Sequence, residues 1–354
     1  MAFPSTLDAR DPVALLSLAR DNLALWARHG PAPSGGMFHC LRDDGSVYDG
    51  ATRHVVSSTR LVCLFAWAIT RRVPPLPPPA LPWRHYLDSC LAFLRERHLT
   101  PCGGYAWVVR VEADAACATP GPQPPTPPAP ADATNRAYAL SFVLLAYSAA
   151  AAAGVAEARG WLDEVMATLT LRFWEPAHNL YADEASPDFT VVSPYRGQNA
   201  NMHLTEAHMA AWGATRDVAH LQRARAIARA MCVVQAQRVA DSTGCGALVY
   251  EHYRQDWSAP DLEYNVDRPK DRFKPWGFQP GHLLEWAKLL AQLEALAAAA
   301  PEAAPDAEAG AWRLPTARRF FDAAMRGWDE QRGGGGFVYS LRPEPGLPLG
   351  DCDK

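Results

Sequence analysis

Residues 195–212 read Tyr-Arg-Gly-Gln-Asn-Ala-Asn-Met-His-Leu-Thr-Glu-Ala-His-Met-Ala-Ala-Trp. If this segment is helical from Asn199 onward, His203 and Glu206 follow at spacings of four and three residues, so the three side chains share one helix face. An amide, an imidazole and a carboxylate on one face can bind a polyhydroxylated ligand or tune a proton-transfer group. A buried histidine capped by a nearby glutamate in an ordinary helical core explains the same pattern equally well.

A second polar pattern lies at residues 280–286, which read Pro-Gly-His-Leu-Leu-Glu-Trp. Pro280 and Gly281 start a predicted helix, so His282 falls in its first turn and Glu285 lies one turn further on. Glu285 can hold the His282 imidazole in one tautomer while the helix N-terminus disfavours the imidazolium, which suits a general acid/base near neutral pH. A structural histidine at a helix start, beside a surface charge cluster, is the competing interpretation.

Two arginines and two aromatic residues are further candidates for a ligand site. Arg60 lies in an otherwise apolar helical run, and Arg272 lies in the cationic segment shortly before the second pattern. Arg60 is expected either to face a ligand or to form a structural ion pair, and Arg272 to clamp a sugar oxygen or a developing enediolate. Tyr105 and Trp107, two residues apart in a glycine-rich loop, could stack on a sugar ring, although such aromatics more commonly pack onto the core.

Helical periodicity recurs along the chain, and glycine- and aromatic-rich loops with short hairpins fill alternate gaps. Recurrent apolar strands, which a parallel sheet would need between the helices, are not found. The pattern therefore predicts an all-α toroid of helical hairpins in a single domain, with catalytic groups where the long loops converge. The expected helices are 11–28, 52–71, 83–97, 135–153, 156–174, 199 onward, 217–239, 281–299 and 312–328, followed by a short strand at 337–341.

The composition is that of a globular protein with a large core and no basic surface. The 354 residues are 49% hydrophobic with a mean hydropathy of -0.18. The net charge of -4 does not indicate binding to nucleic acid or to an anionic membrane. No signal peptide or membrane span is recognised, and the eight cysteines include no Cys-x-x-Cys pair, which predicts a cytoplasmic protein. Residues 115–133, rich in proline and alanine, are expected to form an exposed insertion.

Motifs for several common cofactors are missing from the sequence. It contains no Walker loop, no Gly-x-Gly-x-x-Gly and no Gly-x-Ser-x-Gly. The sequence therefore does not indicate ATP binding, dinucleotide binding or the catalytic serine of an α/β-hydrolase. The two His-x-x-Glu pairs, at His203 and His282, run in the reverse order to the Glu-x-x-His of di-iron bundles, and His-Glu-x-x-His is absent. Neither a catalytic metal nor another cofactor is expected.

Four short segments together resemble the N-acylglucosamine 2-epimerase superfamily, which includes mannose isomerases, sulfoquinovose isomerase and cellobiose 2-epimerases. They are Val-Ser-Ser-Thr-Arg at 56–60, Gly-Gly-Tyr-Ala-Trp at 103–107, Asn-Ala-Asn-Met-His-Leu-Thr-Glu-Ala at 199–207 and Pro-Gly-His-Leu-Leu-Glu-Trp at 280–286. The resemblance covers essentially the whole chain and is greatest to the mannose isomerase branch. It implies an (α/α)6 barrel that isomerises or epimerises a free sugar at C1 and C2 without a metal.

The resemblance also implies roles for single residues. His282 would remove the C2 proton to give a cis-enediolate, with Glu285 as its orienting partner. Reprotonation at C1 would give a ketose, and at the opposite face of C2 an epimer. His203 would contribute to catalysis as a sugar binder or polariser, and Arg60 and Arg272 would stabilise the enediolate oxygens. The residues expected to bind substrate are Arg60, Tyr105, Trp107, Asn199, Glu206 and Arg272.

The superfamily barrel has twelve helices, whereas nine are expected in this sequence before Lys354. The resemblance places the remaining helices and the second catalytic histidine after this point, which amounts to about 50 residues at typical helix and loop lengths. A barrel without a quarter of its wall would expose apolar helix faces. The chain is therefore expected to be truncated at its C-terminus and to have little or no activity, which wild-type-like turnover would contradict.

The leading hypothesis is an isomerase that interconverts an unphosphorylated aldose such as mannose with its ketose. The nearest alternative is a 2-epimerase of an N-acylated hexosamine or a β-linked disaccharide such as cellobiose. A third is a sugar-binding relative without activity. A fourth is a glycoside hydrolase using carboxylates in a loop, Asp183, Glu184 and Asp188, that nothing in the sequence positions. A small-molecule sugar is the expected partner, and a homodimer is compatible with the sequence.

Overall fold

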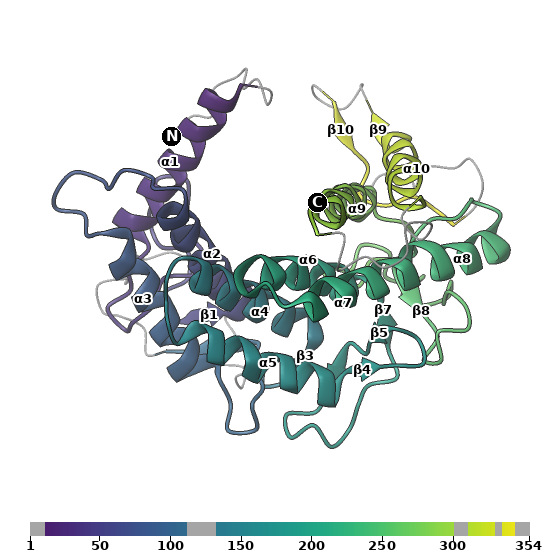
Figure 1. Ribbon diagram of the computed structural model, residues 1–354, viewed down its shortest axis with the longest axis horizontal. Helices are drawn as coiled ribbons and strands as arrows, with labels where there is room; N and C mark the ends of the chain where they lie inside the picture. The colour runs from purple at the N-terminus through teal and green to yellow at the C-terminus, as the bar shows by residue number, and fades with distance from the viewer. Residues whose placement is uncertain (1–10, 112–131, 301–310, 330–334, 344–354) are drawn as a thin grey trace. The chain divides into compact units, whose positions relative to one another are not determined.

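The computed structural model describes residues 11–111, 132–300, 311–329 and 335–343. Within these ranges the chain is mainly helical, with two-stranded sheets between the helices (Figure 1). The helices are α1 (Pro12–His29), α2 (Val55–Thr70), α3 (Trp83–Phe93), α4 (Ala137–Ala152), α5 (Ala158–Arg172), α6 (Gln198–Thr215), α7 (Val218–Arg229), α8 (Ala236–Thr243), α9 (Pro280–Ala299) and α10 (Arg313–Met325). The strands are β1 (Thr52–His54), β2 (Val108–Arg110), β3 (Asn135–Arg136), β4 (Trp174–Glu175), β5 (Leu180–Tyr181), β6 (Glu184–Ala185), β7 (Arg196–Gly197), β8 (His252–Tyr253), β9 (Trp328–Asp329) and β10 (Gly336–Phe337).

The chain divides into two compact units. The first consists of residues 1–168 with 186–190, and the second consists of residues 169–185 with 191–354. The expectation of a single domain stays a prediction. Residues 115–131 of the expected insertion lie outside the described residues. No helix in the described part of the chain is long and apolar enough to cross a membrane.

The first unit is built around α2, which packs against α3 and α4. The His54 side chain caps α2 by accepting the backbone N–H of Val56 at 3.2 Å, which explains why the helix begins here. In the core, Phe65 of α2 stacks on Trp83 and Tyr86 of α3, with ring centroids 6.3 and 5.2 Å apart. Apolar residues at helical spacing therefore produce the predicted helix pairing in this unit.

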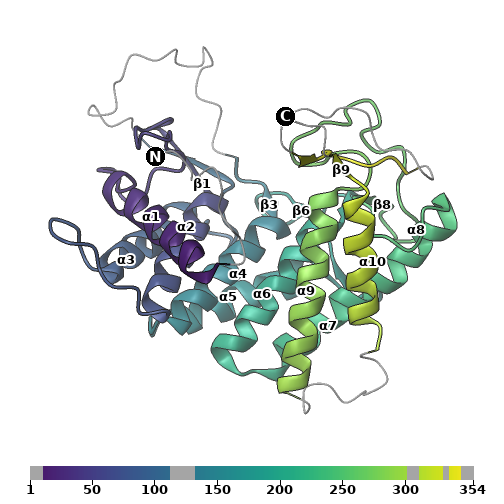
Figure 2. The same cartoon turned by 90° about the horizontal axis from the view of Figure 1, so that it is seen from above.

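The second unit contains two helix pairs, in which α6 packs against α7 and α9 lies along α10 (Figure 2). Helix α9 begins at Pro280, whose fixed φ suits the first helical position, and it buries Leu283, Trp286, Leu290 and Leu293 on one face. Helix α6 also contacts α9. This contact matters for the site because the two polar patterns of the sequence lie on these two helices.

The helices predicted from periodicity are confirmed, but several predicted ends are wrong. Residues 52–54 and 135–136 form β1 and β3 ahead of α2 and α4, and Trp174 belongs to β4. The helix expected at 217–239 contains a π-helical turn at Ala230–Gln235 and runs on to Thr243, where Gly244 ends it at a φ of 71°. The helix expected at 312–328 ends at Met325, and Trp328 instead starts β9, which pairs with β10. The expected strand at 337–341 is correspondingly shorter.

A histidine pair is buried between α6 and α7. Nδ1 of His208 lies 3.2 Å from Nδ1 of His220, and Nε2 of His208 lies 3.2 Å from the hydroxyl of Tyr181, which accepts a hydrogen bond from Arg223. At this distance one nitrogen donates its hydrogen and the other accepts it through a lone pair, so the two rings cannot both be protonated. Burial first, and then the neighbouring His220 and Arg223, hold the pKa of His208 well below its ordinary value.

We expect acidification below about pH 6.5 to lower the free energy of unfolding. In this pH range His208 becomes protonated in the unfolded chain but stays neutral in the folded protein. Burial also lowers the pKa of His252, and lowers those of His54 and His98 to about 4, so these three add in the same direction. His282 opposes them because its pKa is raised. Urea unfolding at several pH values, with His208→Gln as the comparison, checks the sign. Parallel stability curves for the two proteins would contradict the role of His208.

Candidate active site

His282 is the third residue of α9, with 26% of its side chain exposed. Its Nδ1 lies 2.8 Å from Oε1 of Glu251 and 2.9 Å from Nε2 of Gln198. Glu251 stands immediately before β8, and its side chain is almost fully buried. The sequence pattern predicts that Glu285 orients His282, but the structure gives this contact to Glu251. Nothing in the local sequence around His282 points to a carboxylate 31 residues away.

The charge around His282 favours its protonated form. Burial alone would lower the pKa of the imidazole, but the Glu251 carboxylate, by charge and by hydrogen bond, and then the charge of Glu285 raise it above its ordinary value. An imidazole whose pKa is raised takes up a proton more readily, and the same nitrogen can later return it. This property suits a general acid/base.

His203, Glu206 and Glu285 form a second group where α6 meets α9. Nδ1 of His203 is 3.4 Å from Oε2 of Glu206 and 3.9 Å from Oε1 of Glu285, and Nζ of Lys288 is 3.3 Å from Oε1 of Glu206. The His203 hydrogen bond, together with the Lys288 ammonium, lowers the pKa of Glu206 to about 2. The structure thus brings the two predicted polar patterns together, with Glu285 facing His203.

Two amide side chains at the start of α6 have contrasting surroundings. Oδ1 of Asn199 is buried without a hydrogen-bond partner among the described residues, which leaves it open to a donor such as a sugar hydroxyl. Asn201 is satisfied instead: it accepts from the backbone N–H of Tyr181 at 2.8 Å and donates to the Tyr181 carbonyl at 3.0 Å. Asn199 is therefore the better candidate for a ligand contact.

In the cationic segment before α9, Lys274 rather than Arg272 contacts other side chains, Glu184 and Tyr195, which are half-buried. Nζ of Lys274 is 3.2 Å from Oε1 of Glu184 and 4.0 Å from the centroid of the Tyr195 ring. Arg272 is exposed and forms no hydrogen bond or ion pair with other described residues. Asp183, beside Glu184, is buried, which raises its pKa to about 8. These contacts place no pair of carboxylates across a substrate position, so they lend no support to the hydrolase alternative.

Three predicted substrate residues lie in the first unit, and two of them are core residues there. Tyr105 is 2% exposed and its hydroxyl lies 2.8 Å from that of Tyr147, while Trp107 is 8% exposed. The aromatic loop therefore packs onto the core, the more common outcome for such residues. Arg60, expected either to face a ligand or to form a structural ion pair, is exposed, with its guanidinium 4.7 Å from the ring centroid of Phe142. Arg60 thus stays available to a ligand.

Among the described residues, His203, Glu206 and Glu285 are the one group of three that could hold a metal ion, with ligand atoms within 4.8 Å of one another. Lys288 already neutralises Glu206, and its positive charge would repel a divalent cation there. The expectation that no metal takes part stays a prediction.

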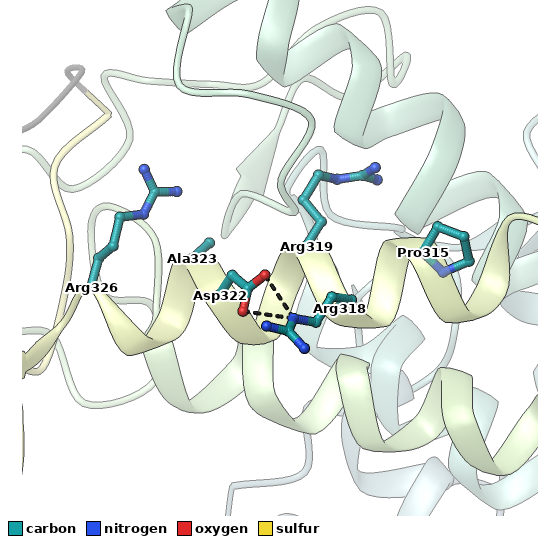
Figure 3. A pocket seen from close by; sticks show the side chains of 6 residues that line it. All are labelled: Pro315, Arg318, Arg319, Asp322, Ala323 and Arg326. Carbon is teal, nitrogen blue, oxygen red and sulfur yellow. Dashed lines mark hydrogen bonds and ion pairs between the residues drawn. The ribbon is translucent and has the colours of Figure 1, made fainter.

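A hollow of about 510 Å³ is lined by residues between Pro315 and Arg326, and its lining does not include His203 or His282 (Figure 3). Its lining includes three arginines, but its one carboxylate, Asp322, accepts from Nε of Arg318 at 2.9 and 2.8 Å through its two oxygens. It contains no histidine or other group suited to proton transfer near neutral pH. The hollow is therefore not a candidate for acid/base chemistry on a sugar.

Comparison of the sequence with known proteins gives a consistent result. Residues 36–348 match the family model of N-acylglucosamine 2-epimerase (GlcNAc 2-epimerase). A D-mannose isomerase from Marinomonas mediterranea is 41% identical over 309 residues, which cover 87% of this chain and 68% of that protein. A D-mannose isomerase from Thermobifida fusca is 38% identical over 209 residues, which cover 58% of this chain and 47% of that protein.

Solved structures give the same result for the fold. A crystal structure of D-mannose isomerase superposes with a TM-score of 0.80 at 37% identity, covering 97% of this chain and 78% of that one. A cellobiose 2-epimerase from Spirochaeta thermophila superposes with a TM-score of 0.67 at 18% identity, covering 96% of this chain and 76% of that one. At that identity the second likeness concerns the fold alone. The predicted all-α fold of the (α/α)6-barrel class is confirmed.

Proposed function

Because the chain belongs to the N-acylglucosamine 2-epimerase family of sugar isomerases and epimerases, we propose that it interconverts an unphosphorylated aldose and its ketose, of the mannose and fructose type. The observation that carries this proposal is the hydrogen-bonded pair of His282 and Glu251, whose helix α9 packs against the His203 group on α6. The choice of mannose is supported by the 41% identity to a D-mannose isomerase.

In the proposed mechanism, Nε2 of His282 removes the proton from C2 of the open-chain aldose, and the electron pair moves to form a cis-enediolate with the negative charge on the C1 oxygen. The imidazolium then returns the proton to C1 while the hydrogen of the C2 hydroxyl passes to the C1 oxygen, which leaves a carbonyl at C2 and a hydroxyl at C1. One C–H bond, one O–H bond and the C=O double bond each move between C1 and C2, and the sugar's overall oxidation state is unchanged, so no external oxidant or reductant is needed.

The other polar residues are proposed to bind and orient the sugar. Asn199, with its unpartnered amide oxygen, accepts a hydroxyl hydrogen, and His203 and Glu206 bind further hydroxyl groups. The exposed guanidinium groups of Arg60 and Arg272 are the candidates to stabilise the enediolate oxygens. Tyr105 and Trp107 are not assigned to the substrate because both are buried in the core of the first unit.

A 2-epimerase is the second candidate because it begins with the same proton abstraction, and the fold also occurs in a cellobiose 2-epimerase. The two products differ only in where the proton returns. Return to C1 gives the ketose, whereas return to the opposite face of C2 gives the epimeric aldose.

Proton NMR of the complete protein with D-mannose in deuterated water tests the proposal, while the expected truncation of the 354-residue chain and its expected loss of activity stay predictions. We expect the mannose C2 proton to exchange while fructose accumulates. Parallel samples with N-acetylmannosamine and cellobiose test the epimerase alternative. Formation of a C2 epimer without ketose would overturn the isomerase proposal. Binding of sugar with no exchange at C2 would instead identify a sugar-binding relative without activity.

We further propose that the protein works in the cytoplasm, as its scattered cysteines predict, and as a homodimer. Light scattering coupled to size-exclusion chromatography measures the assembly directly. A mass of one chain of 38.7 kDa at micromolar concentration would contradict the dimer.

A further inference from the structure

Behind His282 lies a chain of buried polar side chains that the proposed proton transfer does not itself involve. It runs from Trp286 through Gln198 to Glu251, and all three side chains are almost completely buried. Buried polar groups are costly unless they are paired, so a fully connected chain of this kind is informative about protonation states.

The orientation of the Gln198 amide follows from its first neighbour. An indole N–H can only donate, and Nε1 of Trp286 lies 2.8 Å from Oε1 of Gln198, so this atom is the amide oxygen and accepts. The amide nitrogen therefore points toward Glu251, with Nε2 lying 3.3 and 3.4 Å from the two carboxylate oxygens. An amide N–H can only donate, and it faces both oxygens of Glu251, an arrangement that suits a carboxylate whose two oxygens accept.

The protonation of His282 follows in turn. An ionised Glu251 can only accept, so Nδ1 of His282 must carry the hydrogen that it donates across the distance of 2.8 Å. Nδ1 then has no lone pair that could accept a hydrogen bond from the Gln198 amide nitrogen 2.9 Å away. The Gln198 amide therefore donates to the Glu251 carboxylate instead. Among the described residues, Nε2 of His282 has no partner, so its lone pair is free when the ring is neutral.

The backbone explains how residues so far apart in the sequence meet. In the antiparallel pair of β7 and β8, Gly197 lies opposite His252, and the next backbone N–H, that of Gln198, donates to the carbonyl of Glu251 at 3.2 Å. Gln198 and Glu251 are thus neighbours across this short sheet. Helix α9 supplies both His282 and Trp286, one turn apart, so the sheet and the helix fix the whole group.

We propose that Glu251 is the positioning residue of this site: held by Gln198 and Trp286, it fixes the Nδ1–H tautomer of His282 and makes Nε2 the atom that exchanges protons with substrate. The claim that Glu251 fixes the tautomer of His282 concerns the protein without substrate. Only the claim that Nε2 exchanges protons with substrate rests on the proposed isomerase function. The charged groups that face His282 are Glu251 from the loop before β8 and Glu285 from its own helix.

The test compares Glu251→Gln with the unaltered chain by 15N NMR of histidine-labelled protein, in which the His282 signals are identified by their loss in His282→Asn. We expect the unaltered chain to show a protonated Nδ1 and an unprotonated Nε2 once the ring is neutral. Glu251→Gln removes the charge that raises the pKa of His282, so its titration should move to lower pH. An Nε2–H tautomer in the unaltered chain, or an unchanged titration in the variant, would overturn the proposal.

The kinetic readout separates positioning from a merely structural role. Glu251→Gln should lower kcat by about 100-fold with little change in KM, and should move the acidic limb of the pH profile to lower pH, because a base with a lower pKa stays neutral in more acidic solution. Glu251→Asp keeps the negative charge, so it should recover part of kcat. The acidic limb of its pH profile should lie near that of the unaltered protein. A loss of kcat with an unmoved limb in Glu251→Gln would overturn the proposal.

Glu294→Gln is the matched control. Glu294 is also a glutamate tied to a buried partner, Arg313, but it lies 12 residues beyond His282 on α9, about 18 Å along the helix axis. Its replacement should leave both the His282 titration and kcat unchanged. If the NMR results are as expected and yet no sugar shows C2 exchange, the positioning role of Glu251 stands and the isomerase proposal fails.

Discussion

Replacement of His282 with asparagine is expected to lower the rate of C2 proton exchange by about 1,000-fold, within the range that removal of a general acid/base typically costs. Asparagine keeps a polar group of similar reach that can still donate to Glu251, but its amide cannot take up a proton at any pH near neutrality. The variant therefore removes the proton-transfer step while it preserves the buried hydrogen bond behind the site.

The measurement is the exchange rate of D-mannose in deuterated water, followed with sugar binding by calorimetry. Binding should be retained within a few-fold because the proposed hydroxyl ligands Asn199, His203 and Glu206 are unaltered. His85→Asn, an exposed histidine in the first unit, is the control and should exchange at the unaltered rate. Exchange that survives in His282→Asn would remove this residue from the proton-transfer role.

Much of the fold could be predicted because its helices bury regular apolar faces. Helix α9, with Pro280 at its start and Leu283, Leu290 and Leu293 on its buried face, is an example in which local signals and final packing agree. The wrong ends lie where tertiary contacts decide, as at Trp328, which pairs in a hairpin instead of continuing α10. Periodicity alone does not report such pairing.

The candidate site was predictable only in part, for a related reason. His203 and Glu206 share a helix face, so their spacing in the sequence predicts their contact. The same logic assigned Glu285 to His282, but an in-helix spacing of three residues allows a contact without requiring it. The actual partner, Glu251, is brought in by the pairing of β7 and β8, two strands of two residues each that carry almost no sequence signal.

The aromatic loop shows a different limit. Tyr105 and Trp107 alternate in a short glycine loop, a pattern equally compatible with stacking on a sugar and with packing on the core. In the structure Tyr105 contacts Tyr147 and Trp107 contacts Arg136, whose positions in the first unit could not be predicted from the loop itself. Residue type alone therefore could not predict the burial of these two aromatic side chains.

Loss of the Glu175 carboxylate is expected to destabilise the second unit strongly. Oε1 and Oε2 of Glu175 lie 2.5 and 3.0 Å from two nitrogens of the Arg196 guanidinium, which is 4% exposed, and Oε2 also accepts from the indole N–H of Trp257 at 2.6 Å. Glu175→Gln would leave this guanidinium buried without its counter-charge. Breaking a buried ion pair in this way typically costs about 3 kcal/mol or more.

The same substitution should also weaken the site, because Arg196 forms β7 with Gly197, and β7 aligns Gln198 with Glu251. Urea unfolding at pH 7.5 measures the stability change, and histidine NMR at the same pH reports the His282 tautomer. Asp322→Asn is the control, since its ion pair with Arg318 is exposed on both sides and should contribute no measurable stability. Equal destabilisation by the two substitutions would contradict the role of burial. A large loss of stability from Glu175→Gln alone would show that the buried ion pair anchors the strand on which the proposed positioning of His282 depends.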